Sequence, residues 1–132
     1  MTQGLRTFFT FQGGRARAAL DLYGEVFEDF ELIDIDLYGS GDVGPEGTVK
    51  VAQFRLAGSQ FSCADSPISH DWGFTPAVSL WVECDDDREL ERLFAELGRA
   101  GQAFMPLDNY GFSRRFGWVG DRFGVTWQLN LT

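Results

Sequence analysis

The chain has 132 residues, with 11 Lys and Arg against 20 Asp and Glu, and its formal net charge is −9. This length predicts one domain, large enough to bury roughly two-thirds of its unfolded surface. The acidic balance argues against binding to nucleic acid or to an anionic membrane, because both repel a negatively charged protein.

Two further features indicate where the protein works. No stretch approaches the ~20 apolar residues of a membrane helix, and the first residues lack the apolar core of a signal peptide. Cys63 and Cys84 have the spacing of neither a disulfide scaffold nor a zinc site. We therefore expect a soluble, cytoplasmic protein with two half-buried thiols.

The first half of the chain predicts the order strand, helix, strand, strand, strand. Period-two and helical apolar spacings indicate the segments Leu5–Gln12, Arg15–Phe27, Phe30–Tyr38, Thr48–Leu56 and Ser59–Ala64. Asp34 and Asp36 alternate with isoleucines in the third of these segments, which favours the wet face of an edge strand over a catalytic carboxylate pair.

The second half repeats that order after a linker at 66–75. The segments are Pro76–Cys84, the helix Asp85–Ala100, and the strands Ala103–Leu107, Ser113–Val119 and Phe123–Leu131. Asp86 and Glu89 have capping-box spacing, so the acids at 85–87 are explained by helix capping better than by calcium binding. Repetition predicts an α+β domain over 1–132 made of two βαβββ modules, at about 4–65 and 76–132.

The stretch from Phe116 to Leu131 is the most informative. It predicts a hairpin about a tight turn at Gly120-Asp121-Arg122. In its second arm the apolar residues alternate with Thr126, Gln128 and Asn130. A polar face on a hydrophobic strand needs solvent or a lined cavity, and we predict a cavity.

This same stretch resembles a known family. Tyr110-Gly111-Phe112-Ser113, Phe116-Gly117-Trp118-Val119 and Trp127-Gln128-Leu129 closely resemble the C-terminal signature of the PhnB-like proteins. These form a branch of the vicinal-oxygen-chelate superfamily, which contains glyoxalases, bleomycin-resistance proteins and extradiol dioxygenases. The resemblance implies two βαβββ modules forming a curved mixed sheet around a cleft, usually completed in a homodimer.

The resemblance also implies where a metal would be held. The superfamily's metal enzymes carry one ligand on each of four strands, and the matching positions here are Phe8, Ser62, Ala77 and Gln128. Transition metals need three or four nitrogen or carboxylate donors, which this set lacks. We therefore predict no metal and no cofactor.

Members of this branch are often described as 3-demethylubiquinone 3-methyltransferases. The sequence shows no glycine-rich strand-to-helix loop of the kind that holds a methyl-donor nucleotide, so we do not expect methyl transfer.

The same register predicts which side chains line the cleft, because alternate residues of a strand share a face. The predicted inner face comprises Phe8, Thr10, Gln12, Gln60, Ser62, Ala64, Ala77, Ser79, Trp81, Thr126, Gln128 and Asn130. The predicted helix-facing residues are Phe9, Phe11, Phe61, Val78, Leu80, Trp127 and Leu129. Amides, hydroxyls and one or two aromatic rings suit a small, flat, polar ligand.

Three other kinds of residue could contribute chemistry. His70, the only histidine, lies in the linker and is either a surface or dimer contact or a residue at the cleft mouth. Only one of Arg114 and Arg115 can point inward, and Arg114 is our candidate for an anionic ligand; the alternative is that both pair with surface acids. Cys63 falls on the helix side and is not expected to be a nucleophile.

Two functions remain open. One is a metal-free, dimeric module that binds a small polar or aromatic molecule. The other is a glyoxalase- or dioxygenase-like enzyme, either metal-dependent or using Gln128 with Arg114 or His70.

Overall fold

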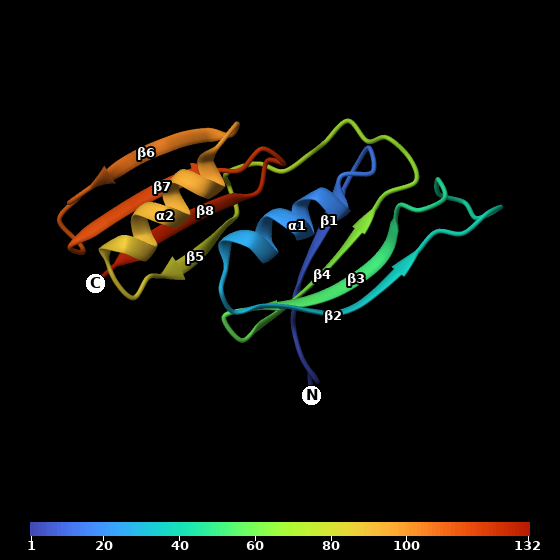
Figure 1. The fold of residues 1–132 in the computed structure, drawn as a ribbon, viewed down its shortest axis with the longest axis horizontal. Coiled ribbons are helices and arrows are strands. Elements are labelled where there is room, and N and C mark those ends of the chain that lie inside the picture. The colour runs from blue at the N-terminus through green and yellow to red at the C-terminus, as the bar shows by residue number, and fades with distance from the viewer. The chain divides into compact units, whose positions relative to one another are not determined.

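The protein is described by a computed structural model that covers all residues from Met1 to Thr132. It forms two compact units, Met1–Trp72 and Gly73–Thr132. The first contains β1 (Thr7–Phe11), α1 (Ala16–Val26), β2 (Phe30–Leu37), β3 (Val49–Leu56) and β4 (Ser59–Asp65) (Figure 1). Its four-stranded sheet has the order β1-β4-β3-β2, in which β1 runs parallel to β4 and the other neighbours are antiparallel.

The second unit has the same topology. It contains β5 (Ser79–Glu83), α2 (Asp87–Gly98), β6 (Gln102–Asp108), β7 (Arg115–Gly120) and β8 (Thr126–Leu131). The sheet order is β5-β8-β7-β6, with β5 parallel to β8. The predicted fold class, two βαβββ modules with mixed sheets, is confirmed. Neither helix is long and apolar enough to cross a membrane.

The core of the first module lies between α1 and one face of its sheet. Apolar side chains recur along α1 at helical spacing, and the buried ones are Ala16, Ala19, Leu20, Leu22, Tyr23 and Val26. The sheet contributes phenylalanines: the ring of Phe61 lies 5.7 Å from that of Phe9 and stacks 5.2 Å from that of Phe54. Phe9 and Phe61 are therefore on the helix side, as their strand parity predicts.

A buried carboxylate fixes the start of α1. Arg15, at the N-cap, gives the helix no side-chain cap. Instead Asp65, at the end of β4 and only 2% exposed, accepts hydrogen bonds from Ala16 N and Val49 N, both at 2.9 Å. Asp65 thus joins the ends of three elements, and it satisfies one of the free N–H groups of the helix terminus.

A second buried carboxylate, that of Asp121, holds the turn between β7 and β8. Its Oδ1 accepts from Phe123 N at 2.9 Å and Val125 N at 3.1 Å, and its Oδ2 accepts from the indole Nε1 of Trp127 at 3.0 Å. These bonds extend the turn between β7 and β8 as far as Val125. The turn predicted at 120–122 is therefore too short, because the carboxylate holds two further backbone N–H groups outside the ladder.

Two other local predictions are wrong. Strand β5 begins at Ser79 rather than at Pro76, because Pro76 and Ala77 form a turn in which Ala77 N donates to the hydroxyl of Thr75 at 3.3 Å. Val78, predicted to face the helix, is 78% exposed. A bulge between Leu32 and Asp34 also interrupts the alternation in β2.

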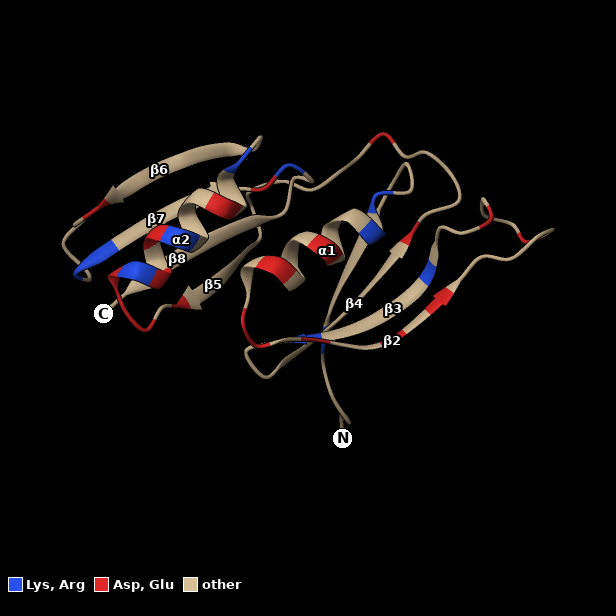
Figure 2. Cartoon of the chain, in the orientation of Figure 1, with Lys and Arg blue, Asp and Glu red and all other residues tan.

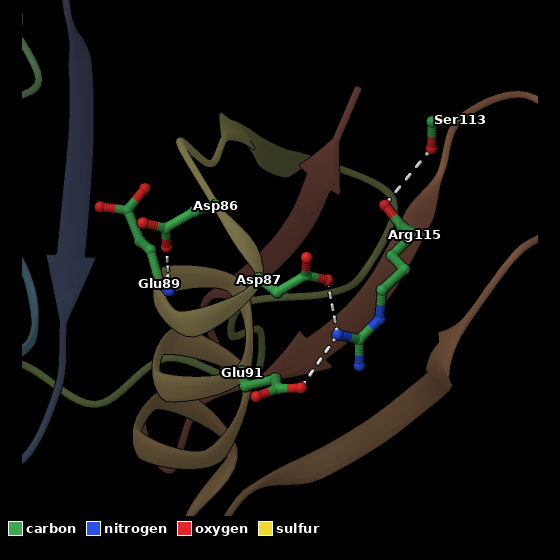
Figure 3. Close-up of polar contacts among 6 residues, drawn as sticks. All are labelled: Asp86, Asp87, Glu89, Glu91, Ser113 and Arg115. Carbon is green, nitrogen blue, oxygen red and sulfur yellow. Dashed lines mark hydrogen bonds and ion pairs between the residues drawn. The ribbon is translucent and has the colours of Figure 1, made fainter.

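The remaining helix and edge predictions agree with the structure. At the start of α2, the carboxylate of Asp86 accepts from Glu89 N at 2.8 Å (Figure 3). The carboxylate of Glu89 in turn accepts from Asp85 N at 3.0 Å. This is the predicted capping pair. Asp34 and Asp36 are exposed on β2, which is an edge strand.

We predict that Asp65→Ala lowers the free energy of unfolding by about 2–4 kcal/mol, because two buried N–H groups lose a charged acceptor. Urea denaturation followed by circular dichroism measures this change. Asp36→Ala, which removes an exposed acid, is the matched control and should change stability by less than about 0.5 kcal/mol. Equal stability of the two variants would contradict the role given to Asp65.

Candidate functional site

Each sheet has one face covered by its helix and a second face that its own module leaves uncovered, here called the open face. In the second module the register pairs Ser79 with Thr126, Trp81 with Gln128, and Glu83 with Asn130. These six side chains lie on the open face, because Trp127 and Leu129 of the alternate positions are buried toward α2. Five of them are predicted inner-face residues, and Glu83 is the addition.

Glu83 is the hub of a hydrogen-bond network on this face. Its carboxylate accepts from the indole Nε1 of Trp81 at 2.6 Å, from Asn130 Nδ2 at 3.1 and 3.3 Å, and from Thr132 Oγ1 at 3.2 Å. At the other end of the strands, the hydroxyls of Ser79 and Thr126 lie 2.7 Å apart. The alternation of Ser79 and Trp81, continued by two residues, would have identified Glu83 from the sequence.

The network favours the charged form of Glu83, which is exposed. Its pKa lies below the ordinary value of 4.5, chiefly because of the hydrogen bond from Trp81 and next because of that from Asn130. Glu83 is also the only charged residue of β5, and β8 has none, as Figure 2 shows.

Two further aromatic rings, those of Phe112 and Phe116, lie beside Trp81, and the sequence analysis did not predict them there. Phe116 of β7 is the register partner of Asn130 and therefore shares its face. Its buried ring lies 5.5 Å from Trp81 and 5.1 Å from Phe112, which precedes β7. Trp81 and Phe112 are 50% and 58% exposed. These three rings, here called the aromatic cluster, offer two accessible surfaces above a buried base.

Two polar side-chain atoms of the second module are buried without a hydrogen-bond partner: Asn130 Oδ1 and the indole Nε1 of Trp118. Trp118 is the register partner of Gln128 on β7 and therefore also belongs to the open face. Buried polar groups are nearly always hydrogen-bonded in proteins, so an unfilled acceptor and an unfilled donor on one face require an explanation.

The open face of the first module carries a different set of side chains. Phe8 pairs with Ser62 and Thr10 with Ala64, while Gln60 lies opposite Arg55. Arg55 is occupied by an ion pair with Glu31 at 2.9 Å. A cavity of about 40 Å³ lies among residues 6, 33, 53–55, 60 and 61, which is space for water rather than for a ligand.

Gln12 has a structural use. Its Oε1 accepts from His70 N and its Nε2 donates to Trp72 O, both at 2.7 Å. The His70 ring stacks 4.2 Å from that of Trp72, and its Nε2 lies 2.8 Å from Ser66 Oγ. Gln12 therefore anchors the linker against β1, and both ends of its amide are already bonded.

A larger cavity, of about 310 Å³, lies where the linker passes the start of α1. It is lined by Gly13, Gly14, Pro45, Thr48, Asp65, Ser66, Pro67, Ile68 and Ser69. The only charged group in this lining is the Asp65 carboxylate, and both its oxygens are bonded to backbone N–H groups.

The structure separates the two arginines. Arg115 points toward α2, where its Nη1 binds Asp87 at 2.8 Å and Glu91 at 2.9 Å (Figure 3). The hydrogen bond from Arg115 lowers the pKa of Asp87, and the charge of Arg114 lowers it further. Arg114 is exposed just before β7, and its charge therefore acts on the helix side as well.

The predicted ligand positions do not form one donor set. Phe8 and Ser62 are register partners, as the resemblance implies, but the β5 residue opposite Gln128 is Trp81. Ala77 lies in the turn at Pro76 and not in a strand, so its assignment as a ligand position is wrong. No group of three or more His, Cys, Asp or Glu side chains is placed to hold a metal ion.

The two cysteines are more deeply buried than the sequence suggested. Both are free thiols, and burial raises the pKa of Cys63 and of Cys84 to about 12. Thiols of this kind are unreactive, because the nucleophile is the thiolate.

Comparison with known proteins identifies the family. Residues 3–130 match the family described as 3-demethylubiquinone-9 3-methyltransferase. The chain belongs to this family. The PhnB protein of Bacillus cereus is 42% identical over 98% of this chain and 100% of its own, with a TM-score of 0.93. A Pseudomonas aeruginosa protein is 25% identical over 98% of both chains, with a TM-score of 0.84.

The resemblance to PhnB-like proteins is thereby confirmed. Protein YjdN of Escherichia coli is 28% identical over 92 residues, which is 70% of this chain and 62% of YjdN. The fold is shared more widely: the fosfomycin resistance protein of Listeria monocytogenes is 13% identical over 98% of this chain and 93% of its own, with a TM-score of 0.67. A Frankia glyoxalase/bleomycin resistance/dioxygenase domain is 17% identical over 99% and 98%, also at 0.67.

We predict that the contact between Trp81 and Glu83 in this PhnB-like protein is complete at neutral pH and is lost only below pH 4.5. A carboxylate with a lowered pKa keeps its stabilising contact above its unfolded pKa and loses it as the pH falls through the folded one. The indole N–H signal of Trp81 in ¹⁵N–¹H NMR spectra reports the transition. In Glu83→Gln, whose amide does not titrate, this acid transition should be absent; its persistence would assign it to another group.

Proposed function

We propose that this PhnB-like protein binds a small, planar, polar molecule on the open face of its second module, without a metal ion. The observation that carries the proposal is the aromatic cluster of Trp81, Phe112 and Phe116, bordered by the hydrogen-bonding groups of Gln128 and Asn130. Exposed rings supply area for stacking, and the amides fix the orientation of the ligand through hydrogen bonds. Ligand sites usually combine these two kinds of group.

The activity in the family's description is not the one that this geometry favours. The glycine-containing turn between β1 and α1 is the one place where a strand leads through consecutive glycines into a helix. There the Asp65 carboxylate already takes the first N–H of α1. An anionic group of a methyl-donor nucleotide would meet a carboxylate at this position, which is unfavourable.

Stacking is the main source of binding energy in this proposal, and the chain offers a matched pair of tryptophans to test it. Trp81→Ala should weaken binding about tenfold, because the ligand loses a ring face. Trp72→Ala removes a ring of similar exposure, 53%, from the linker and should leave affinity unchanged. Gln128→Ala, which removes a directional hydrogen bond, should also weaken binding.

The ligand can be sought with a thermal-shift screen of glutathione adducts, fosfomycin, glycopeptide antibiotics and quinones, followed by calorimetry on the three variants. Unchanged affinity in both Trp81→Ala and Gln128→Ala would refute binding on this face. Elemental analysis of protein purified without chelator tests the second part of the proposal. A stoichiometric transition metal would favour the metal-dependent enzyme instead.

We also propose a cytoplasmic homodimer. The edge strand β2 exposes three apolar side chains, those of Leu32, Ile33 and Leu37. Exposed apolar groups on an unpaired edge promote association unless a partner covers them. Light scattering should therefore give twice the 14.8 kDa chain mass, and Ile33→Lys should shift the protein toward the monomer. A monomer at all concentrations would refute the dimer.

A further inference from the structure

We propose that the molecule bound on this face presents an N–H or O–H donor to Asn130 Oδ1, and that it is neutral or cationic rather than anionic. This inference rests on the proposed function and adds the chemical class of the ligand. Planar carboxamides and amidines have these properties, whereas planar carboxylates do not.

The first step is the orientation of the Asn130 amide. Glu83 is ionised and can only accept hydrogen bonds, and both of its oxygens lie within 3.3 Å of Asn130 Nδ2. The amide nitrogen is therefore fixed toward Glu83, and Oδ1 is directed elsewhere. Asn130 is only 5% exposed, yet Oδ1 has no hydrogen-bond partner. A buried acceptor gains most from a donor that arrives with a ligand.

The second step is the neighbourhood of Asn130. Its register partner on β7 is Phe116, the buried base of the aromatic cluster. Directly opposed residues of an antiparallel pair have Cβ atoms about 4.5–5.5 Å apart. A flat ring stacked on the cluster thus has its edge close to Asn130. Because Oδ1 is covered, a ligand reaches it by displacing the ring of Phe112, which is 58% exposed and lies 5.1 Å from that of Phe116, while Trp81 stays hydrogen-bonded to Glu83.

The third step is charge. Glu83 is the only charged residue on β5 and β8, and the hydrogen bonds from Trp81 and Asn130 favour its charged form. Arg115, the one basic residue of β7, points toward α2, where it pairs with two carboxylates. Glu83 therefore places a negative charge directly beside Asn130, which disfavours a ligand carboxylate at that position and favours an amidinium.

Three probes with one ring system separate these features: 2-naphthamide, 2-naphthamidine and 2-naphthoate. They share the naphthalene that the aromatic cluster would stack, and they differ in donor count and charge. Titrations followed by tryptophan fluorescence give dissociation constants, and ¹⁵N–¹H spectra follow the side-chain amide of Asn130 and the indole of Trp81. We expect the amide and the amidine to bind at least about tenfold more tightly than the naphthoate.

Two variants assign the preference to its residues. Asn130→Leu removes the acceptor, so the amide should lose its advantage over the naphthoate. Glu83→Gln retains an acceptor for Trp81 and Asn130 but removes the charge, so the amidine should lose its advantage over the amide while the amide keeps its own. Gln53→Leu, an amide-to-leucine change at an exposed position of the first module, is the control and should alter neither ratio.

The outcomes distinguish the inference from the proposed function. If none of the three probes binds, or if binding leaves the Trp81 signal unchanged, the aromatic face is not a binding site and both fail. If naphthoate binds as tightly as naphthamide, the site stands and the inference fails. Should Asn130→Leu not fold, the wild-type preference and the Glu83→Gln ratios still decide the question.

Discussion

Each sheet of this protein has two faces and a single helix, and this constraint shapes everything else. Covering one face of a four-stranded sheet with α1 or α2 buries the apolar half of every strand and leaves the other half open. In the first module the open half holds Phe8, Ser62, Gln53 and Gln60, with Arg55 in an ion pair with Glu31. In the second it holds aromatic rings and a connected set of polar side chains. The same topology therefore carries two open faces of different composition.

Each module is stabilised internally by a buried carboxylate, although the protein is strongly acidic overall. Asp65 and Asp121 each collect backbone N–H groups from segments that no ladder satisfies. Such groups are costly to bury unpaired, and an ionised acceptor satisfies several at once. The positions differ: Asp65 lies at the end of β4, and Asp121 lies between β7 and β8. The two modules thus share a topology but stabilise different turns, which leaves their open faces free to differ.

The sequence predicted the parts of the fold that depend on periodicity. Strand alternation placed Phe9, Phe61 and Trp127 on the helix side and Gln128 and Asn130 on the open side, because a period of two is a local property of the chain. The errors in the bounds of β5 and β8 involve side chains that accept hydrogen bonds from backbone N–H groups. Asp121 lengthened a turn and Thr75 delayed β5, and neither effect changes the hydrophobic pattern.

The candidate site was predicted less completely, for a related reason. Phe116 joins Trp81 only because β7 pairs with β8 and β8 with β5, and that neighbourhood exists only once the sheet order is known. Glu83 was missed although its parity was evident, since a charged residue at a strand end is usually solvated. Glu83 is exposed here too, yet its carboxylate accepts hydrogen bonds from three side chains.

Under the function that we propose, this arrangement would determine what the site selects. When stacking supplies most of the binding energy, rings of similar size are held almost equally well, and discrimination falls to the few polar atoms whose direction is fixed. In the proposed site Asn130 has this part, because its amide nitrogen is held by the Glu83 carboxylate and its oxygen is left for the ligand.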